Sequence, residues 1–463
     1  MLRDAHTRSA VSLAITRILF GLSAPLLGTS LAMADDVPCT NVSNGKGGQA
    51  CTAHLTGTTA PNQTTGDDHG NGHSGGNGGP TDPLNFSLTS ATQLTDAAGW
   101  SPLDVRTTGG GGGNAYHADT TEADKTGGNG GSGAQPGDIT VAVGDAVSGV
   151  SNTGGVNALT LYSQGGTGGG SGKGSNFDGT DGTAGTGGNA GAINGTVDGN
   201  WLVNLGAGGP RSVFIWSQGG AGGFGANYET GLLAQGADAA AGGNGGNIAI
   251  SLLNSSGGNN QFSAPGGVLI QSVGGTGGNG GNAENFDGAQ GGTGGQGGAA
   301  GNVDVTVGPK VSIRELNDND AGLHALSQGG AGGVGGTGAT GGTAGAGYNA
   351  GNVSVTFQGG SIVATGTYSP GVLAQSLGGN GGDGGSASKF VVGPNGGAGS
   401  TGGTAGTVSV TGAGINILTG QYVDPVNFEG SPGILAQSVG GGGGSGSAAS
   451  GWFAVGEIGR AHV

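Results

Sequence analysis

Short stretches in which apolar and polar residues alternate recur along the chain at an almost constant interval. Alternation of this kind predicts a β-strand with one buried face. The intervals between the starts of successive stretches are 55, 54, 55, 55, 50 and 55 residues. INGTV is the weakest stretch, since Gly195 takes its middle apolar position. The seven are LNFSL at Leu84, ITVAV at Ile139, INGTV at Ile193, IAISL at Ile248, VDVTV at Val303, VSVTF at Val353 and VSV at Val408.

A second signal follows each stretch: a small hydroxyl residue, any residue and two glycines. It begins 23 to 30 residues after the start of the stretch, at Thr107, Ser163, Ser217, Ser272, Ser327, Ser376 and Ser438. The segment between the two signals, for example 353–376, holds three strand candidates (VSVTF, SIVAT and GVLAQ) separated by turn residues. Three strands in about 24 residues are typical of one coil of a parallel β-solenoid. We therefore predict an all-β fold, a parallel β-helix or β-solenoid of about seven ~55-residue repeats with glycine-rich tracts between the coils.

The glycine-rich tract of each repeat allows three interpretations. It runs for 26 to 32 residues from the hydroxyl signal to the next strand and is built on Gly-Gly-x, as in 274–302. The tract could be a flexible loop on one side of the solenoid, a second and poorly packed coil, or a set of extended polyglycine-type helices lying side by side. We favour a coil or loop that projects from one face, because unstructured excursions of this length are unusual in compact domains.

Composition narrows the class of protein. Glycine accounts for 121 of the 463 residues, and only 9% are charged, against roughly 25% in ordinary globular proteins. Collagen is excluded, because the chain has no strict Gly-X-Y period and only 14 prolines. The formal net charge is −16 and no Lys/Arg cluster occurs. Nucleic acid is therefore not expected as a partner, since binding to the phosphate backbone depends on such clusters.

The N-terminus has the pattern of a secretory signal peptide. Three arginines precede the 14-residue apolar stretch 18–31, which is too short to span a bilayer comfortably, and Ala32-Met33-Ala34 forms an A-x-A cleavage signal. We predict a signal peptide over 1–34, cleaved after Ala34. A polar Gly/Asn/Thr-rich segment over 35–83 follows, and it holds the only cysteines, Cys39 and Cys51. In an exported protein such a pair predicts a disulfide bond.

Three motifs have a partial likeness to metal-binding or phosphate-binding sequences. GGNGGDGG (378–385) matches the calcium-binding nonapeptide only in part, because Gly385 stands where an aliphatic residue is needed. His69 and His73 are expected in a solvated loop. GKGS (172–175) lacks the glycine spacing and the helix of a phosphate loop. We therefore expect no metal, no cofactor and no catalytic site.

Two further sets of residues are expected to be structural. Asn247, Asn302 and Asn352 each precede the first strand of a repeat, and a ladder of asparagines at a corner explains them best. Trp201, Trp216 and Tyr228 lie within one repeat. Aromatic residues are too sparse for a carbohydrate-stacking stripe, so a core or edge position is expected for these three.

One phrase carries a resemblance to a known family. SPGILAQSVGGGGG (431–444), its near copy SPGVLAQSLGG (369–379) and the VSV-type strands resemble the passenger regions of bacterial autotransporters of the outer-membrane β-barrel type, over 84–457. The resemblance implies export and a β-helix displayed on the cell surface, at the exterior of the outer membrane. It also implies two partners: a C-terminal translocator barrel of the same polypeptide and the barrel-assembly machinery. No set of barrel strands is evident. IGRAHV (458–463) departs from the local composition and is expected to be a non-native, adapter-derived tail, with the solenoid truncated at 457.

The expected function is therefore that of a surface-displayed passenger, structural or adhesive rather than enzymatic, which attaches to a host or neighbouring-cell surface. Two alternatives remain. The chain could be the passenger of a secreted enzyme whose catalytic part is missing, or a glycine-rich structural repeat protein of the cell surface without a barrel.

Overall fold

The structure is a computed structural model. It describes residues 40–43, 49–62, 73–88, 92–96, 100–118, 125–151, 156–174, 181–203, 210–228, 235–255, 260–283, 288–388, 394–420 and 431–450. These residues form strands and extended segments and no helix. The predicted signal peptide with Ala32 and Ala34, and the expected tail 458–463, lie outside the described residues.

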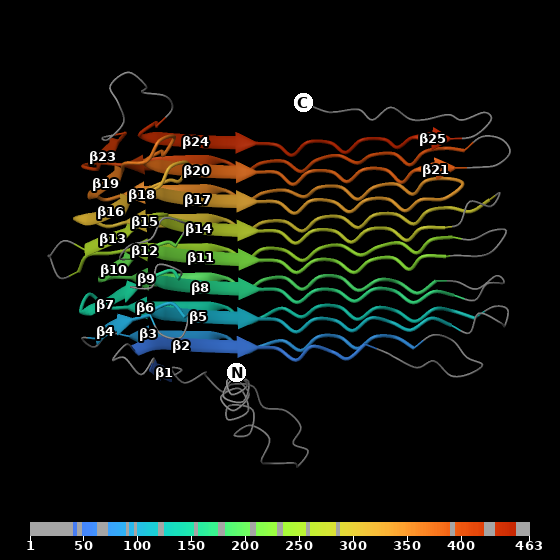
Figure 1. Ribbon diagram of the computed structural model, residues 1–463, viewed down its shortest axis with the longest axis horizontal. Coiled ribbons are helices and arrows are strands. Elements are labelled where there is room, and N and C mark those ends of the chain that lie inside the picture. Colours follow the sequence, from blue (N-terminus) through green and yellow to red (C-terminus); the bar gives the residue numbers. More distant parts are fainter. Residues whose placement is uncertain are drawn as a thin grey trace, which may run out of the picture. The chain divides into compact units, whose positions relative to one another are not determined.

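Three sheets of parallel strands, stacked in chain order, form the solenoid (Figure 1). Sheet B consists of β3 (Leu84–Leu88), β6 (Ile139–Val143), β9 (Ile193–Val197), β12 (Ile248–Leu252), β15 (Val303–Val307), β18 (Val353–Phe357) and β22 (Val408–Gly412). Sheet C consists of β4 (Thr92–Thr95), β7 (Val147–Ser151), β10 (Asn200–Val203), β13 (Asn260–Ala264), β16 (Val311–Glu315), β19 (Ser361–Ala364) and β23 (Asn416–Thr419). Sheet A consists of β1 (Thr40–Ser43), β2 (Gln49–Thr56), β5 (Leu103–Thr108), β8 (Leu159–Gln164), β11 (Val213–Gln218), β14 (Val268–Val273), β17 (Leu323–Gln328), β20 (Val372–Leu377) and β24 (Ile434–Val439), and only β1 in it is antiparallel to its neighbour.

Each coil takes one strand from sheet B, one from sheet C and one from sheet A, in that order. The three strands predicted within 353–376 are β18, β19 and β20. Equivalent residues of successive coils pair directly, as Val303 does with Val353. The predicted fold class, an all-β parallel solenoid with seven repeats, is therefore confirmed.

The core of the solenoid is filled by the inward positions of the three sheets. Val305, Ile313 and Ala325 belong to one continuous cluster of buried residues that extends through the coils. Gly195 in β9 occupies an inward position without a side chain because a Cβ there would lie 1.8 Å from the Val141 carbonyl oxygen of the preceding coil, and its φ is +143°. The weakest of the predicted strands is thus a strand in which two backbones approach closely.

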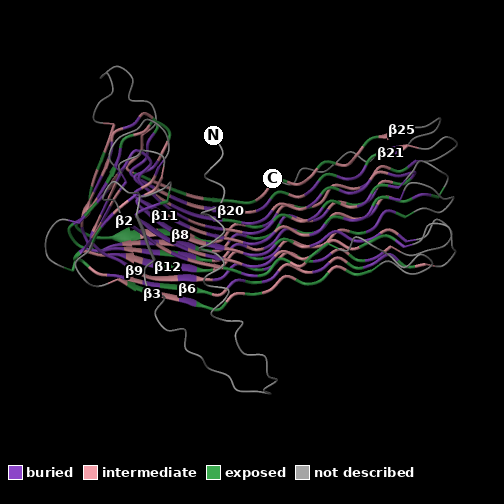
Figure 2. Cartoon of the chain, turned by 60° about the horizontal axis from the view of Figure 1, so that its bottom comes forward, coloured by how far each residue is buried: buried purple, intermediate pink, exposed green. Residues whose placement is uncertain are grey.

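After each of β2, β5, β8, β11, β14, β17 and β20 the chain leaves the solenoid as an outgoing run and comes back as a return run, and β24 is followed by an outgoing run (Figures 1 and 2). We call these runs together the glycine blade. Its described outgoing runs are 57–62, 109–118, 165–174, 219–228, 274–283, 329–339, 378–388 and 440–450, and its return runs are 73–82, 125–138, 181–192, 235–247, 288–302, 340–352 and 394–407.

Hydrogen bonds recur at every third residue of the blade. In the outgoing run 219–228, the N–H of Gly219 donates to Val273 at the end of β14, and the N–H groups of Gly222 and Gly225 donate to the next outgoing run. The N–H groups of Gly220 and Gly223 donate instead to the return run of the preceding repeat. Three residues per turn without hydrogen bonds inside the run is the geometry of a polyproline II or polyglycine helix. The blade therefore consists of two layers of such helices, outgoing runs in one and return runs in the other.

This arrangement decides between the three interpretations of the tract. The tract does project from one side of the solenoid, but it is wrong to describe it as a loop or a second coil. The structure shows polyglycine-type helices lying side by side. The length of the tract is nearly constant because the hydrogen bonds of each run must match those of its neighbours.

The close approach of the runs explains the Gly-Gly-x pattern. A Cβ on Gly277 would lie 1.9 Å from the carbonyl oxygen of Gly295, and one on Gly278 would lie 2.0 Å from that of Gly223. Both glycines face neighbouring runs, whereas the third residue of the triplet, such as Thr276 or Asn279, is exposed. A side chain on Gly277 or Gly278 would therefore have to displace the neighbouring run.

The hydroxyl signal marks the neck where solenoid and blade join. Ser272 donates to the Gly246 carbonyl (2.9 Å) and accepts from the Gly301 N–H (2.8 Å). Ser217 makes the same pair of bonds with Gly191 (3.0 Å) and Gly246 (2.8 Å). The hydroxyls of Ser217, Ser272, Ser327 and Ser376 thus each hold two successive return runs beside a strand of sheet A, which explains why a hydroxyl residue recurs there.

The stacked architecture includes residues that precede Leu84. Strand β2 pairs in parallel with β5, and residues 57–62 and 73–82 already form runs of the blade. Residues of the polar segment 35–83 therefore form part of a repeat that precedes the one beginning at Leu84.

Candidate binding face on sheet A

The outward positions of sheet A form a continuous face that stacking assembles from distant residues. Val105, Leu161 and Ile215 point into the core, so their neighbours along each strand point outward. The parallel register places His54 beside Arg106, Arg106 beside Tyr162, and Tyr162 beside Trp216. These four residues lie about one repeat apart in the sequence and next to one another on the sheet.

A buried carboxylate organises the first part of this face. Asp104 is only 1% exposed at its side chain, and its Oδ1 lies 2.9 Å from Nε2 of His54 and 2.5 Å from Nε of Arg106. Nη2 of Arg106 donates to Oδ2 of the same carboxylate at 2.8 Å. A bidentate bond of this type fixes the plane of the guanidinium, so the arginine is held in place.

Aromatic rings surround this arginine. Its guanidinium carbon lies 5.4 Å from the ring centre of Trp100 and 5.9 Å from that of Tyr162. The ring of Trp216 meets those of Tyr162 and Phe214 edge-on, at 5.5 Å and 5.8 Å. Burial raises the pKa of Tyr162 above its ordinary value, and Arg106 opposes the shift. We call His54, Trp100, Arg106, Tyr162, Phe214 and Trp216 the aromatic patch.

Two properties of the aromatic patch favour binding. Trp100 remains 37% exposed, and no described residue accepts a hydrogen bond from the buried Nε1 of Trp216. Rings with a polar group at one end are typical of binding surfaces, because they bury a large apolar area and also offer a hydrogen bond. The exposed ring of Trp100 can therefore stack against a partner.

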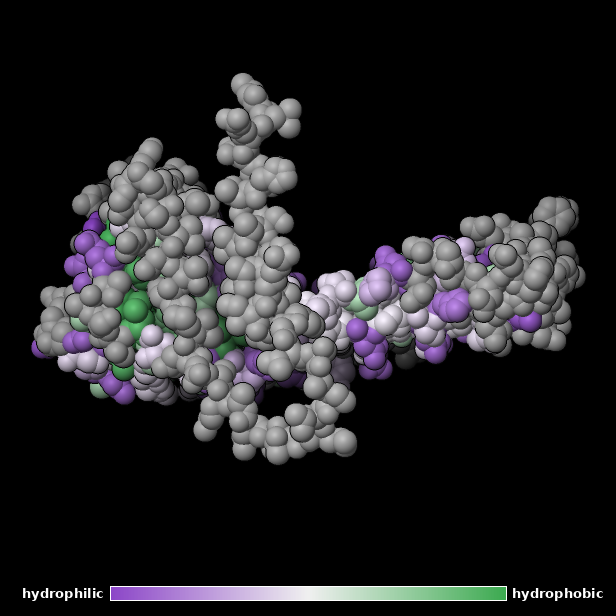
Figure 3. Space-filling view, turned by 90° about the horizontal axis from the view of Figure 1, so that it is seen from below, coloured by the Kyte–Doolittle hydropathy of each residue, from purple (hydrophilic) through white to green (hydrophobic). Residues whose placement is uncertain are grey.

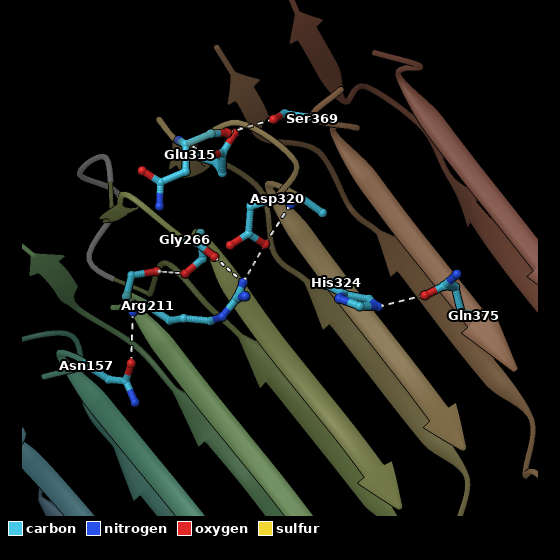
Figure 4. Close-up of polar contacts among 12 residues, drawn as sticks. Asn157, Arg211, Gly266, Glu315, Asp320, His324, Ser369 and Gln375 are labelled. Atoms are coloured by element: carbon cyan, nitrogen blue, oxygen red, sulfur yellow. Dashed lines mark hydrogen bonds and ion pairs between the residues drawn. The ribbon is translucent and has the colours of Figure 1, made fainter. Parts of the chain in front are cut away.

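Further along, an arginine links its own coil to three others at the corner that leads into sheet A (Figure 4). The backbone N–H of Arg211 donates to Oδ1 of Asn157 in the preceding coil (2.9 Å). Its guanidinium donates to the carbonyl of Gly266 in the next coil and, at 2.8 Å, to Oδ1 of Asp320 in the coil after that. Both charged side chains are largely buried, so this ion pair supports the corner more than a surface pair would.

Amide and imidazole groups continue the outer face. Nε2 of His324 lies 3.0 Å from Oε1 of Gln375, as Figure 4 shows, and Nε2 of Gln375 donates to Oε1 of Gln437 at 2.6 Å. Burial is the main cause that lowers the pKa of His324, and the charge of Arg211 acts in the same direction. The imidazole is therefore neutral at physiological pH.

A buried carboxyl group lies at the same corner. Glu315, the last residue of β16, is fully buried; its Oε1 accepts from the Asn317 N–H, and no described residue donates to its Oε2. Burial raises its pKa to about 8, and Asp320 and Asp318 contribute in the same direction. The carboxyl is therefore protonated at neutral pH. The described residues contain no group of three or more His, Cys, Asp or Glu side chains that could hold a metal ion.

The residues weighed for metal or phosphate binding have other surroundings. Oδ1 of Asp383 accepts from the Ser445 N–H at 2.7 Å, so the aspartate of GGNGGDGG links two runs of the blade. The carbonyl of His73 accepts from Tyr116 within the blade, whereas His69 lies outside the described residues. Gly172 belongs to an outgoing run, and Ser175 of GKGS is not described.

The asparagines and aromatic residues that were expected to be structural all lie among the described residues. The asparagine ladder is confirmed: Oδ1 of Asn247 accepts from the Asn302 N–H, and Oδ1 of Asn302 from the Asn352 N–H, both at 2.8 Å. Trp201 is fully buried in the core. Tyr228 is buried in the blade beside Lys173, whose Nζ lies 4.9 Å from its ring centre. Trp216 instead lies on the outer face of sheet A.

Only one of the two cysteines predicted to form a disulfide bond lies among the described residues. Cys51 is buried on β2 and is disulfide-bonded. Cys39 lies outside the described residues, so the Cys39–Cys51 pairing stays a prediction.

The aromatic patch was not predicted from the sequence. A signal was present, because Arg106, Tyr162 and Trp216 each come directly before the hydroxyl residue of their repeat. Aligning the repeats on that residue would have placed the three side chains in one row. Along the part of the chain that the structure covers, no helix is long and apolar enough to span a membrane. The chain matches no known family model, no curated protein and no solved structure.

Proposed function

We propose that this protein is an exported passenger displayed on the cell surface, where it serves a structural and adhesive role without catalysis. The aromatic patch on the outer face of sheet A is the observation that carries the proposal. It joins exposed aromatic area to a fixed arginine on a rigid stack of coils. Solenoids present extended surfaces of this kind to their partners.

The two parts of the repeat suit such a role in different ways. The solenoid provides a face on which side chains from several coils lie in one row. The blade has pale, weakly polar surfaces with scattered hydrophilic residues (Figure 3), and it extends each coil without adding a side-chain core. The proposed partners are a host or neighbouring-cell surface and, on the strength of the autotransporter resemblance, a translocator barrel with its assembly machinery.

A display experiment tests the adhesive role. The chain is fused to an autotransporter barrel on a bacterium that does not aggregate, and both cell aggregation and attachment to epithelial cells and abiotic surfaces are measured. We expect at least one of them to rise. Absence of both effects, with the passenger shown by antibody to be on the surface, would contradict the proposal.

A pair of variants assigns the effect to the patch. The double variant Trp100→Ala, Trp216→Ala should reduce attachment strongly, because it removes two of the rings. Phe224→Ala is the matched control, since Phe224 is an exposed aromatic residue of the blade outside the patch. Equal attachment by both variants would show that adhesion does not depend on the aromatic patch.

A further inference from the structure

Five Asn-Gly pairs of the blade bind the next repeat by the same two hydrogen bonds. Oδ1 of Asn279 accepts from the N–H of Val334 at 3.0 Å, and the N–H of Gly280 donates to the carbonyl of that same valine at 2.9 Å. One dipeptide thus holds both backbone groups of one residue in the neighbouring run, and we call this arrangement the Asn-Gly clamp. The other clamps join Asn77-Gly78 to Ser132, Asn129-Gly130 to Thr183, Asn244-Gly245 to Ala299 and Asn380-Gly381 to Gly442.

Asn-Gly is also the dipeptide in which asparagine loses its side-chain amide most readily. A base takes the N–H proton of the glycine, the backbone nitrogen attacks Cγ of the asparagine, and ammonia leaves as the new C–N bond closes a succinimide ring. Glycine favours this attack, because it has no Cβ to hinder the approach and its backbone adopts conformations that other residues avoid. Water then opens the ring at either carbonyl and yields aspartate or isoaspartate.

The clamp engages both groups that this reaction needs. The N–H of Gly280 is already donated to a carbonyl, and the hydrogen bond to Oδ1 of Asn279 holds the side-chain amide on the next run. Access of water does not limit the reaction, because the side chains of all five asparagines are exposed. Protection therefore depends on the hydrogen bonds between runs and ends when a run separates from its neighbour.

We propose that the Asn-Gly clamps are latent modification sites: the assembled blade protects them, and they convert to aspartate or isoaspartate through a succinimide when a run separates from the next repeat. This inference does not depend on the proposed adhesive role.

The two products have different consequences for the blade. Aspartate leaves the backbone unchanged, and Asp383 shows that a carboxylate fits a clamp, since its Oδ1 accepts from the Ser445 N–H while Gly384 donates to the Ser445 carbonyl. Isoaspartate carries the main chain through Cγ and so adds an atom to the backbone, which breaks the match between runs at every third residue. A run that forms isoaspartate while separated can therefore not rejoin its neighbour in register.

Peptide mapping of the full 463-residue chain tests the protection. The native protein and the protein unfolded in guanidinium chloride are kept in the same mildly alkaline buffer, and mass spectrometry follows the loss of ammonia at each asparagine. We expect the five Asn-Gly pairs to convert about tenfold or more slowly in the native protein, since the rate follows the population of the open run. Asn282, which binds Thr337 in the same way but is followed by Ala283, should convert slowly in both samples.

A pair of variants in the next run locates the effect at one clamp. Gly333→Ala, whose Cβ would lie 1.8 Å from the Gly278 carbonyl oxygen, should separate the two runs and raise the conversion of Asn279 by about tenfold or more. Asn77, in a distant repeat, should convert as in the parent. Val334→Ala is the matched control: it shortens an exposed side chain but keeps the backbone groups of the clamp, so neither rate should change.

Equal conversion in the native and the unfolded protein, or a rate at Asn279 that Gly333→Ala leaves unchanged, would overturn the proposal. A rise at Asn77 as well would mean that the variant had unfolded completely, and the comparison of native with unfolded parent would then decide alone. Refolding of the converted protein tests the products by hydrogen exchange. Run 274–283 should exchange rapidly in chains with isoaspartate at position 279 and slowly in chains with aspartate there, and equal exchange would contradict the role given to isoaspartate.

Discussion

At the scale of single residues, the hydroxyl residue at the neck bonds the backbone of the return runs, as Ser272 does with Gly246 and Gly301. We predict that Ser272→Ala lowers the free energy of unfolding by about 1–3 kcal/mol, because two hydrogen bonds, to the partly buried Gly246 carbonyl and from the partly buried Gly301 N–H, are lost. Urea denaturation followed by circular dichroism measures the change. Ser251→Ala, a change at a partly buried position of β12 for which the structure shows no side-chain hydrogen bond, should stay within about 0.5 kcal/mol of the parent. Similar losses in both variants would contradict the role given to the neck.

The buried Glu315 predicts a dependence of stability on pH. Its pKa is raised to about 8 in the folded state from an ordinary value of 4.5, so the unfolded chain loses this proton first as the pH rises. The contribution of Glu315 is therefore fully present below about pH 4.5, is lost progressively up to about pH 8 and stays lost above it.

Glu315→Gln should remove this dependence. The denaturation midpoint of the parent should fall between pH 5 and pH 8 more steeply than that of the variant, and the variant should be the more stable of the two at pH 8. Asp181, whose pKa burial raises to about 6, is present in both proteins and cancels in the comparison. Parallel pH profiles would show that Glu315 is ionised in the folded protein.

At the scale of elements, the blade depends on close backbone contact rather than on side chains. We predict that Gly278→Ala detaches the outgoing run 274–283 from its neighbours, since its Cβ would lie 2.0 Å from a carbonyl oxygen. Hydrogen exchange should then accelerate in this run and in the runs on either side of it. Thr276→Ala, an exposed change two residues away, should leave exchange in the blade as it is.

The elements of the solenoid could be predicted from the sequence because they depend on local alternation. β18, β19 and β20 each bury every second side chain, and this period is visible in one repeat alone. The conformation of the blade could not be predicted so directly, because the partner of Gly219 is Val273 in the next repeat and that of Gly220 is Gly188 in the previous one.

The candidate site was harder to predict than the fold. The ion pair of Arg211 and Asp320 joins residues 109 positions apart, and neither residue belongs to a recurring motif. The aromatic patch depends on the register of four strands. His54 and Trp216 lie in the same row of the sheet only if every intervening coil has the correct length. Composition had suggested aromatic residues too sparse for a stripe, but stacking concentrates them in the first coils.

At the scale of the whole molecule, the strands of each coil pair only with those of the coils before and after it. Deletion of one complete repeat, residues 248–302, should therefore give a folded protein of slightly lower stability. The register supports this, because Ile248 pairs with both Ile193 and Val303, and these two residues would then meet directly. Circular dichroism and thermal melting measure the outcome.

A deletion out of phase provides the comparison. Removal of residues 248–273 takes away the three strands of one coil but leaves both runs of that repeat in the chain, so the blade would no longer match the solenoid. We expect this protein to lose cooperative folding. If both deletions gave equally stable proteins, the solenoid and the blade would not share one repeat.

The interior of the blade also bears on how the molecule responds to temperature. Among the described residues its apolar cluster is small, consisting of Tyr228, Ala283, Ala289 and Ala339, and glycine backbone fills most of the rest. Exposure of apolar surface dominates the heat capacity change of unfolding, and hydrophobic stabilisation weakens on cooling. The solenoid core should follow that rule, whereas the blade should unfold with little heat capacity change. Cold would therefore weaken the coils while leaving the sheet of glycine helices beside them nearly as strong as before.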